Sequence, residues 1–334
     1  MSILVTGAAG YIGSHTCVEL IEAGYQIVGF DNFYNSKRTV PEMIAKITGR
    51  GDRLRFYEAD MMSSSSLERI FNENEIDSVI HFAGYKAVGE SVEKPLMYFE
   101  NNIGGTLNLL DSMNKHGVKK LVFSSSATVY GTPAHVPITE DFPLSVTNPY
   151  GRTKLMIEDI LRDLFISDGS WSIMLLRYFN PVGAHKSGLI CEVPNGIPNN
   201  IMPRLIDTAL GKMDRMTVYG GDYPTRDGTG VRDYIHVVDL AKGHIKAVEA
   251  LEHGPFIEAV NLGTGTGYTV LELIHTFERV NSVKVPYVIT DRRHGDVAEC
   301  YANTDKAARL LGWKAELGLD EMCRSSFEAR LKNS

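Results

Sequence analysis

The stretch ILVTGAAGYIGSHT, residues 3–16, decides the fold of this chain. Its first three residues are apolar and predict a short buried strand. A Gly-x-x-Gly-x-x-Gly turn follows, made by Gly7, Gly10 and Gly13. Glycines at this spacing allow a tight turn and bring the N-terminus of the next helix close to a ligand's phosphates. The stretch is therefore typical of a dinucleotide-binding site.

A helix and a second strand complete this unit. Apolar periodicity over residues 14–23 predicts a helix that ends at Gly24, and residues 26–30 predict a strand that ends at Asp31. A carboxylate at this strand end can hold the hydroxyls of the adenine ribose. Because Asn32 and not an arginine follows the carboxylate, we expect NAD rather than NADP.

Strands and helices continue to alternate through the first half. Further strands are predicted over residues 54–59, 78–84 and 119–126, and helices over residues 67–74 and 101–110. This alternation predicts a parallel, doubly wound sheet, which binds ligands at the carboxyl ends of its strands. His81 lies inside an apolar run, so we expect a hydrogen-bonded core histidine rather than a ligand-binding one.

A tyrosine and a lysine open the next predicted helix, in NPYGRTK at residues 148–154. Tyr150 and Lys154 are four residues apart and project from one helix face. An ammonium beside a phenol favours the phenolate, so we expect Lys154 to lower the pKa of Tyr150 and make it a base. By itself, the pair fits a solvated helix face better, because this spacing is common by chance.

Ser126, at the end of a predicted strand, is expected on the same sheet edge as Tyr150 and Lys154, so that the three groups can act together. The three groups suit removal of a proton from a hydroxyl while its carbon gives a hydride to a nicotinamide. Thr128 is expected to share the task of Ser126. The alternative is that the hydroxyls of residues 124–126 make only structural hydrogen bonds.

Composition narrows the class of protein. The 334 residues suffice for a large core in one domain or two intimate ones, and the net charge of −7 gives no basic face for nucleic acid. No apolar run is long enough to span a membrane, and no basic leader precedes the first strand, so we expect a cytoplasmic protein. Four cysteines, at 17, 191, 300 and 323, fit neither a zinc site nor a disulfide framework, and no metal is expected.

Seven stretches resemble the extended short-chain dehydrogenase/reductase family, and the resemblance covers nearly the whole chain. They are ILVTGAAGYIGSHT (3–16), HFAGYKAVGESVEKP (81–95), FSSSATVYG (123–131), NPYGRTK (148–154), LLRYFNPVGAH (175–185), GIPNNIMP (196–203) and DGTGVRDYIHVVDLA (227–241). The chain is most similar to members that act on UDP-hexoses. Long, specific motifs of this kind do not arise by chance.

The resemblance implies an isomerase that makes no net redox change. Tightly bound NAD would oxidise C4 of the hexose in a UDP-sugar, with Tyr150 as the base. The 4-keto sugar would turn over within the site, and the hydride would return to its opposite face. UDP-glucose and UDP-galactose would thereby be interconverted, with UDP as the anchor and the sugar held weakly.

The resemblance also implies the binding residues. The catalytic set is Ser126, Tyr150 and Lys154. Cofactor-binding positions are Gly7, Gly10, Tyr11, Ile12, Gly13, Asp31, Asn32, Phe33, Asn35, Ser36, Asp60, Met61, Phe82, Ala83, Gly84, Lys86, Asn101, Ser126, Tyr150, Lys154 and Phe179. Substrate-binding positions are Lys86, Ser126, Tyr150, Asn180, Asn200, Thr217, Val218, Tyr219, Arg232, Arg293, Asp296 and Cys300.

The substrate residues lie in a second part of the chain, where the strand–helix alternation breaks into Pro- and Gly-rich stretches. Guanidinium groups suit a pyrophosphate because they make bidentate contacts, although each arginine alone would also fit an exposed surface position. We expect a Rossmann domain over 1–180 and 234–263, and a smaller, discontinuous α/β substrate domain over 181–233 and 264–334. The helices after Ser91 and Tyr150 are expected to form a homodimer, as in relatives.

Cys300 bears on substrate choice. In the family, a tyrosine at this position limits the sugar pocket to hexoses without an N-acetyl group. The smaller cysteine leads us to expect that UDP-N-acetylglucosamine and UDP-N-acetylgalactosamine are interconverted as well. The alternative is an inert buried thiol, with the space filled by Tyr301 or Tyr268.

Two other classes of function are open at this point. One is a nucleotide-sugar 4,6-dehydratase or a UDP-glucuronate decarboxylase. Such lyases resemble the chain broadly but carry an acidic residue near the catalytic hydroxyl, where this chain has Ala127 and Thr128. The other is a non-catalytic dinucleotide sensor, which would not need Ser126, Tyr150 and Lys154 together.

Overall fold

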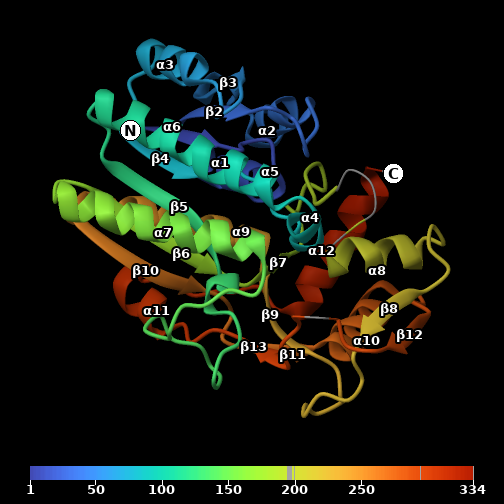
Figure 1. The fold of residues 1–334 in the computed structure, drawn as a ribbon. Helices are drawn as coiled ribbons and strands as arrows, with labels where there is room; N and C mark the ends of the chain where they lie inside the picture. Colours follow the sequence, from blue (N-terminus) through green and yellow to red (C-terminus); the bar gives the residue numbers. More distant parts are fainter. Residues whose placement is uncertain (194–197, 199, 294, 334) are drawn as a thin grey trace.

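The computed structural model describes residues 1–193, 198, 200–293 and 295–333. A parallel seven-stranded sheet with the order β10–β6–β5–β4–β1–β2–β3 forms its larger part (Figure 1). The strands are β1 (Ser2–Thr6), β2 (Gln26–Asp31), β3 (Leu54–Glu58), β4 (Ser78–His81), β5 (Lys120–Ser126), β6 (Ser172–Tyr178) and β10 (Phe256–Leu262). The arrangement confirms the predicted doubly wound α/β fold.

Helices cover both faces of this sheet, as the alternation in β1 illustrates. Ile3 and Val5 join a core with α1 (Tyr11–Glu22), α2 (Val40–Thr48), α9 (Val237–Ala250) and α11 (Asp305–Leu311). Leu4 points to the other core, with α3 (Ser64–Glu73), α6 (Gly105–Lys115) and α7 (Pro149–Ser167). Because successive side chains of a strand face opposite ways, a fully apolar strand is buried on both sides.

A smaller region packs beside the carboxyl edge of the sheet (Figure 1). It has a sheet with the order β11–β9–β13, in which β7 also pairs β9, and a two-stranded sheet of β8 and β12. Its strands are β7 (Asn180–Val182), β8 (Met216–Tyr219), β9 (Val231–His236), β11 (Gly267–Thr269), β12 (Tyr287–Thr290) and β13 (Glu299–Cys300). The helices α8 (Ile201–Ala209), α10 (Val270–Asn281) and α12 (Leu319–Lys332) share its core.

Two helical segments differ from the sequence-based expectation. Helix α1 begins at Tyr11, three residues before the predicted start, because its N-cap Gly10 belongs to the glycine turn. The helix predicted over residues 101–110 begins as a π-helical turn (Glu100–Gly104) and continues as α6, and two short helices, α4 (Val88–Glu93) and α5 (Pro95–Phe99), precede it. Short 3₁₀ turns occupy Gly51–Arg53, Ala127–Tyr130 and Leu251–His253.

Within the described ranges, no helix combines the length and the apolar character needed to cross a lipid bilayer.

Candidate active site

The glycine turn after β1 leaves room for a ligand at the N-terminus of α1. A Cβ on Gly7 would lie 2.9 Å from the Ala83 nitrogen, and one on Gly13 would lie 2.2 Å from the Gly7 oxygen. These two glycines therefore let β1, β4 and α1 pack closely. No side chain caps Gly10, and the first turn of α1 carries no acidic residue. Uncapped N–H groups at a helix N-terminus fit a pyrophosphate.

Asp31 ends β2 beside this turn. Its carboxylate accepts hydrogen bonds from the nitrogens of Ala9 (3.1 Å) and Phe33 (2.8 Å) and from Ser36 Oγ (2.9 Å). Burial raises the pKa of Asp31, while these donors oppose the rise. A carboxylate held this way at the strand end fits a ribose diol, as predicted for NAD.

Other predicted cofactor residues lie at the carboxyl ends of neighbouring strands. The predicted residues are Asn32, Phe33, Asn35 and Ser36 after β2, Asp60 and Met61 after β3, Phe82, Ala83, Gly84 and Lys86 after β4, Phe179 after β6, and Asn101 in the π-helical turn. Asn32 Nδ2 donates to Asp60 Oδ2 at 2.9 Å, which joins two of these ends. Tyr11 and Ile12 begin α1, and the Tyr11 hydroxyl donates to the Gly183 oxygen at 2.6 Å.

His81, the last residue of β4, is a core histidine as predicted. It is buried, with Nδ1 2.8 Å from Thr6 Oγ1 and Nε2 2.9 Å from Thr106 Oγ1. Burial lowers its pKa to about 3, and the charge of Lys154 adds to this effect. The ring stays neutral at pH 7 and pairs the two hydroxyls.

Asn102 is a positioning group that sequence reasoning missed. Its Oδ1 accepts from the Tyr85 nitrogen at 2.8 Å, and its Nδ2 donates to the Tyr85 oxygen at 3.0 Å and to Thr153 Oγ1 at 3.1 Å. It therefore ties the loop after β4 to α7. The sequence feature that could have identified Asn102 is the polar pair Asn101–Asn102 inside an apolar helical pattern.

The predicted catalytic residues come together where β5 ends and α7 begins. The N-cap Asn148 accepts from the Gly151 nitrogen at 2.8 Å and Pro149 starts the helix, so Tyr150 lies in its first turn. Ser126, the last residue of β5, hydrogen-bonds Tyr150. Lys154 Nζ donates to the Ser124 oxygen at 2.7 Å and lies 4.9 Å from the centre of the Phe123 ring.

Burial dominates the electrostatics of this group. It raises the pKa of Tyr150 to about 12 against the hydrogen bond from Ser126, and lowers the pKa of Lys154 to about 8 against the charge of Glu158. The expectation that Lys154 lowers the pKa of Tyr150 is therefore wrong here, because the ammonium is directed to the Ser124 carbonyl. Thr128 Oγ1 is buried beside Gly151 and has no hydrogen-bond partner among the described residues.

The smaller region brings four predicted substrate residues together. Arg293 Nη2 lies 2.9 Å from Asp296 Oδ1, and its guanidinium lies 5.5 Å from the Tyr219 ring centre. Arg232 Nη2 lies 3.9 Å from the same carboxylate, while its Nη1 donates to the Val297 oxygen at 2.9 Å. Thr217, Val218 and Tyr219 form the end of β8.

A carboxylate that was not predicted links the two regions. Glu192 Oε1 accepts from Lys86 Nζ at 3.1 Å and from Asn200 Nδ2 at 2.5 Å. Lys86 follows β4 of the large sheet, whereas Asn200 is the N-cap of α8. No pattern around Glu192 identified it. Within the nearby stretch GIPNNIMP, residues 196, 197 and 199 lie outside the described part of the chain.

Cys300 lies at the border of the two regions. It pairs Arg232 in the register of β13 and β9, and it packs against the apolar cluster that includes Phe179. Asn180 is exposed at the start of β7.

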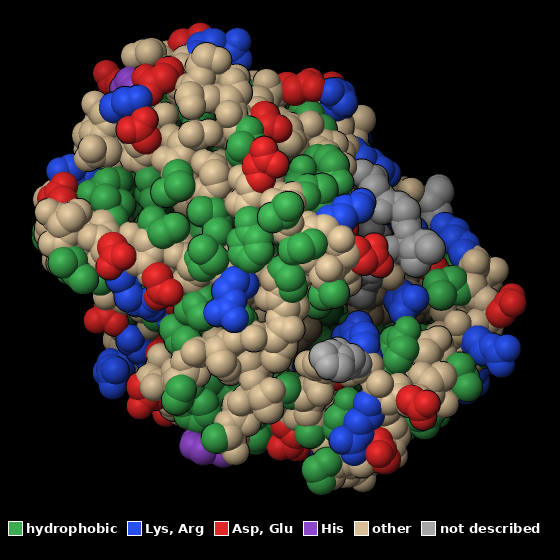
Figure 2. Space-filling model, viewed as in Figure 1, with side chains coloured by type: hydrophobic (Ala, Val, Ile, Leu, Met, Phe, Trp, Pro, Cys, Tyr) green, Lys and Arg blue, Asp and Glu red, His purple; other side chains and the backbone are tan. Residues whose placement is uncertain are grey.

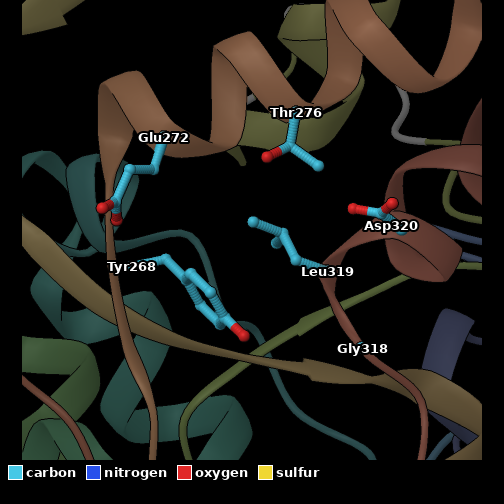
Figure 3. A pocket seen from close by; sticks show the side chains of 6 residues that line it. All are labelled: Tyr268, Glu272, Thr276, Gly318, Leu319 and Asp320. Atoms are coloured by element: carbon cyan, nitrogen blue, oxygen red, sulfur yellow. The ribbon is translucent and has the colours of Figure 1, made fainter.

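The two tyrosines named as alternatives for the space beside Cys300 make contacts elsewhere. The Tyr301 ring lies against Gly267. Tyr268 lines a surface pocket between α10 and the start of α12 (Figure 3); its other lining residues are Glu272, Thr276, Gly318, Leu319 and Asp320.

Comparisons with known proteins agree with this geometry. A family model described as GDP-mannose 4,6 dehydratase matches residues 4–326. UDP-glucose 4-epimerase from Bacillus subtilis is 59% identical over 333 residues, which cover 100% of this chain and 98% of the relative. UDP-glucose 4-epimerase 2 from Arabidopsis thaliana is 56% identical, covering 97% of this chain and 93% of the relative.

A solved structure extends the comparison to bound ligands. The crystal structure of UDP-glucose 4-epimerase from Bifidobacterium longum in complex with NAD+ and UDP has a TM-score of 0.96 and 52% identity. It covers 100% of this chain and 99% of that one. The chain therefore belongs to the extended short-chain dehydrogenase/reductase family, among its UDP-glucose 4-epimerases.

Proposed function

We propose that this protein interconverts UDP-glucose and UDP-galactose. The observation that carries the proposal is the meeting of Ser126, Tyr150 and Lys154 at the sheet edge that also holds the glycine turn and Asp31. When bound, NAD accepts a hydride from C4 of the hexose and gives it back, so that the sugar passes through a 4-keto form. Residues of this chain supply the proton transfer and the binding.

Tyr150 moves the proton of the hexose 4-hydroxyl, and Ser126 holds the same oxygen. A tyrosine with a pKa of about 12 keeps its proton at pH 7, so its role as a base needs positive charge beside it. The oxidised nicotinamide, which is a cation, would supply that charge, because the Lys154 ammonium is directed to the Ser124 oxygen. We assign Lys154, four residues after Tyr150 on the same helix face, to the nicotinamide ribose.

The smaller region anchors the UDP group. Arg232 and Arg293 bind the pyrophosphate, with Asp296 between them, and Tyr219 lies beside the uracil. Asn180 and Asn200 contact the sugar and the phosphates. The proposed cofactor domain is 1–180 with 234–263, and the substrate domain is 181–233 with 264–334, except that α11 packs with α9 and β10.

We further propose that the N-acetylated pair, UDP-N-acetylglucosamine and UDP-N-acetylgalactosamine, is also interconverted. The small side chain of Cys300 beside Arg232 and Phe179 supports this, because Tyr268 and Tyr301 make contacts elsewhere. The test is turnover of all four UDP-hexoses by the wild type and by Cys300→Tyr. We expect the variant to lose the acetylated pair and keep the other. Loss of both pairs, or of neither, would contradict the steric explanation.

A homodimer is also proposed. Large apolar side chains are exposed along α4, α5, α6 and α7, and they form a broad apolar area on the face seen in Figure 2. They are Val88, Val92, Leu96, Leu107, Met156 and Ile166. Two such faces can pair across a twofold axis as a helix bundle. The test is the mass in solution of the wild type and of Leu96→Glu, which should be monomeric.

Four cysteines without disulfide bonds support a reducing compartment, and we propose that the protein works in the cytoplasm.

A further inference from the structure

Glu158 on α7 is a buried carboxylate to which the proposed chemistry assigns no task. It is fully buried, and it accepts four hydrogen bonds from three side chains. Ser125 Oγ lies at 2.5 Å and Arg162 Nη2 at 2.8 Å. The Arg177 guanidinium contributes two bonds, Nε at 2.9 Å and Nη2 at 2.6 Å. Such a bidentate, charge-assisted pair fixes the orientation of the carboxylate as well as its position.

The partners of Glu158 lie next to the catalytic set. Ser125 directly precedes Ser126 and pairs Arg177 in the register of β5 and β6. Glu158 follows Lys154 by four residues, so both project from the same face of α7. Two side chains of α7 therefore hydrogen-bond two successive residues at the end of β5. Lys154 binds the Ser124 oxygen, and one turn later Glu158 binds the Ser125 hydroxyl.

We propose that Glu158 is a positioning residue for the reaction. Through Ser125 it fixes the strand end that presents Ser126 to Tyr150, and it is the anion that accompanies Lys154 in the interior. This inference rests on the proposed function of Ser126, Tyr150 and Lys154. A buried ion pair adds little stability over well-packed apolar groups of the same size. Its main effect is on geometry, and reactive geometry is sensitive to shifts of about 1 Å.

The role of Glu158 as the anion near Lys154 follows from the groups that surround Lys154. From β5 it faces the Phe123 ring and the Ser124 carbonyl, and from β4 it faces His81, which burial keeps neutral. Tyr150 lies on its own helix, and Tyr178 from β6 lies near Tyr150; burial raises the pKa of both phenols, so both are neutral. Glu158 is thus the negative charge that opposes loss of the Lys154 proton. Arg177 and Arg162 are paired with Glu158 itself.

The first experiment is Ser125→Ala in the NAD-loaded enzyme. It removes one hydroxyl and keeps every charge. Ser172→Ala is the matched control, since Ser172 is a buried serine on the adjacent strand β6, at the opposite end of the sheet, and donates to the Gly254 oxygen at 2.9 Å. We expect Ser125→Ala to lower kcat roughly tenfold with an unchanged Kd for UDP. Ser172→Ala should leave kcat unchanged. Equal kcat for both variants would overturn the proposal.

The second experiment is the pH profile of Glu158→Gln. Without the carboxylate, Lys154 loses its proton at lower pH, so the alkaline limb of kcat/KM should move to lower pH. Ser125→Ala retains the charge and should keep the limb in place. A folded, NAD-containing Glu158→Gln with an unmoved limb would overturn the charge role. If this variant does not fold, the kcat of Ser125→Ala decides the positioning role of Glu158, which is the core of the proposal. Tyr150→Phe, assayed in parallel, distinguishes a failure of the Glu158 role from a failure of the proposed function. Full activity of Tyr150→Phe would refute the proposed function itself.

Discussion

The two sides of the site differ in how deeply their side chains are buried and in what holds them. On the sheet side, Lys154 is 5% exposed, and it is held by a main-chain oxygen in the interior. On the other side, the side chain of Arg293 is 59% exposed and pairs with Asp296. The proposed reacting groups are therefore fixed without a substrate, whereas the proposed anchor consists of exposed charges that can turn to a ligand. The first arrangement suits catalysis by preorganised groups, and the second suits binding.

The largest effect should follow from a change on the buried side. Tyr150→Phe removes the hydroxyl that we propose moves the proton, and kcat with UDP-galactose should fall about 10²- to 10⁴-fold. The KM should change little, because the anchor is in the other region. Tyr223→Phe is the control, since the buried Tyr223 hydroxyl has no hydrogen-bond partner in the described part of the chain. Retention of kcat by Tyr150→Phe would remove the distinction between the two sides.

A change on the exposed side should act on binding. Arg293→Ala removes the charge-assisted contact that we propose with the pyrophosphate, so KM for UDP-galactose should rise about 10- to 100-fold, with kcat nearly unchanged. The neighbouring Arg292→Ala serves as the control, because Arg292 pairs with Asp222 and lies over the Tyr223 ring at 4.2 Å. A fall in kcat that exceeds the rise in KM would show that the anchor takes part in the chemistry.

Burial on the sheet side also predicts how stability depends on pH. The pKa of His81 is lowered to about 3. Below pH 6.5 the unfolded chain takes up a proton there while the folded chain does not. Stability is therefore greatest above pH 6.5 and falls towards pH 3, by up to about 1.4 kcal/mol per pH unit for each such histidine. Urea denaturation at pH 7 and pH 5 should show a smaller loss for His81→Gln.

The exposed His275→Gln is the control for that measurement. It should lose as much stability between pH 7 and pH 5 as the wild type. The same loss in His81→Gln would show that His81 is protonated in the folded chain as well.

The smallest effect concerns the link between the two sides. Glu192 holds Lys86 and Asn200 and places a negative charge where an anionic ligand binds. Glu192→Gln should therefore tighten UDP binding by no more than about fivefold, the usual range for an exposed ion pair. Calorimetric titration with UDP would measure this, with Glu252→Gln, from the surface pair with Lys120, as the control. Weaker binding in Glu192→Gln would mean that the carboxylate contacts the ligand directly.

The difference between the two sides also explains what the sequence could predict. The glycine turn, Asp31 and the strand ends follow from local pattern and from the rule that parallel strands carry ligands at their carboxyl edge. The early start of α1 follows from contacts in the glycine turn around its N-cap Gly10, and the π-helical turn before α6 holds Asn102, which contacts Tyr85 and Thr153. Local periodicity does not contain those contacts.

Electrostatics and second-layer contacts were the harder part. The pKa of Tyr150 depends on burial, and the lysine that the Tyr-x-x-x-Lys spacing places nearby is directed to the Ser124 oxygen. Glu158 stands four residues after Lys154 in the sequence, yet its partners Ser125 and Arg177 come from two other strands. Glu192 is likewise defined by residues from both regions. Only the folded chain brings such groups together.

The most direct test is conversion of UDP-galactose by the purified protein with no added NAD. We predict that UDP-glucose forms and that no keto sugar accumulates, because the reacting groups and a retained cofactor complete both half-reactions in one site. No product, or a stable keto product, would contradict this account.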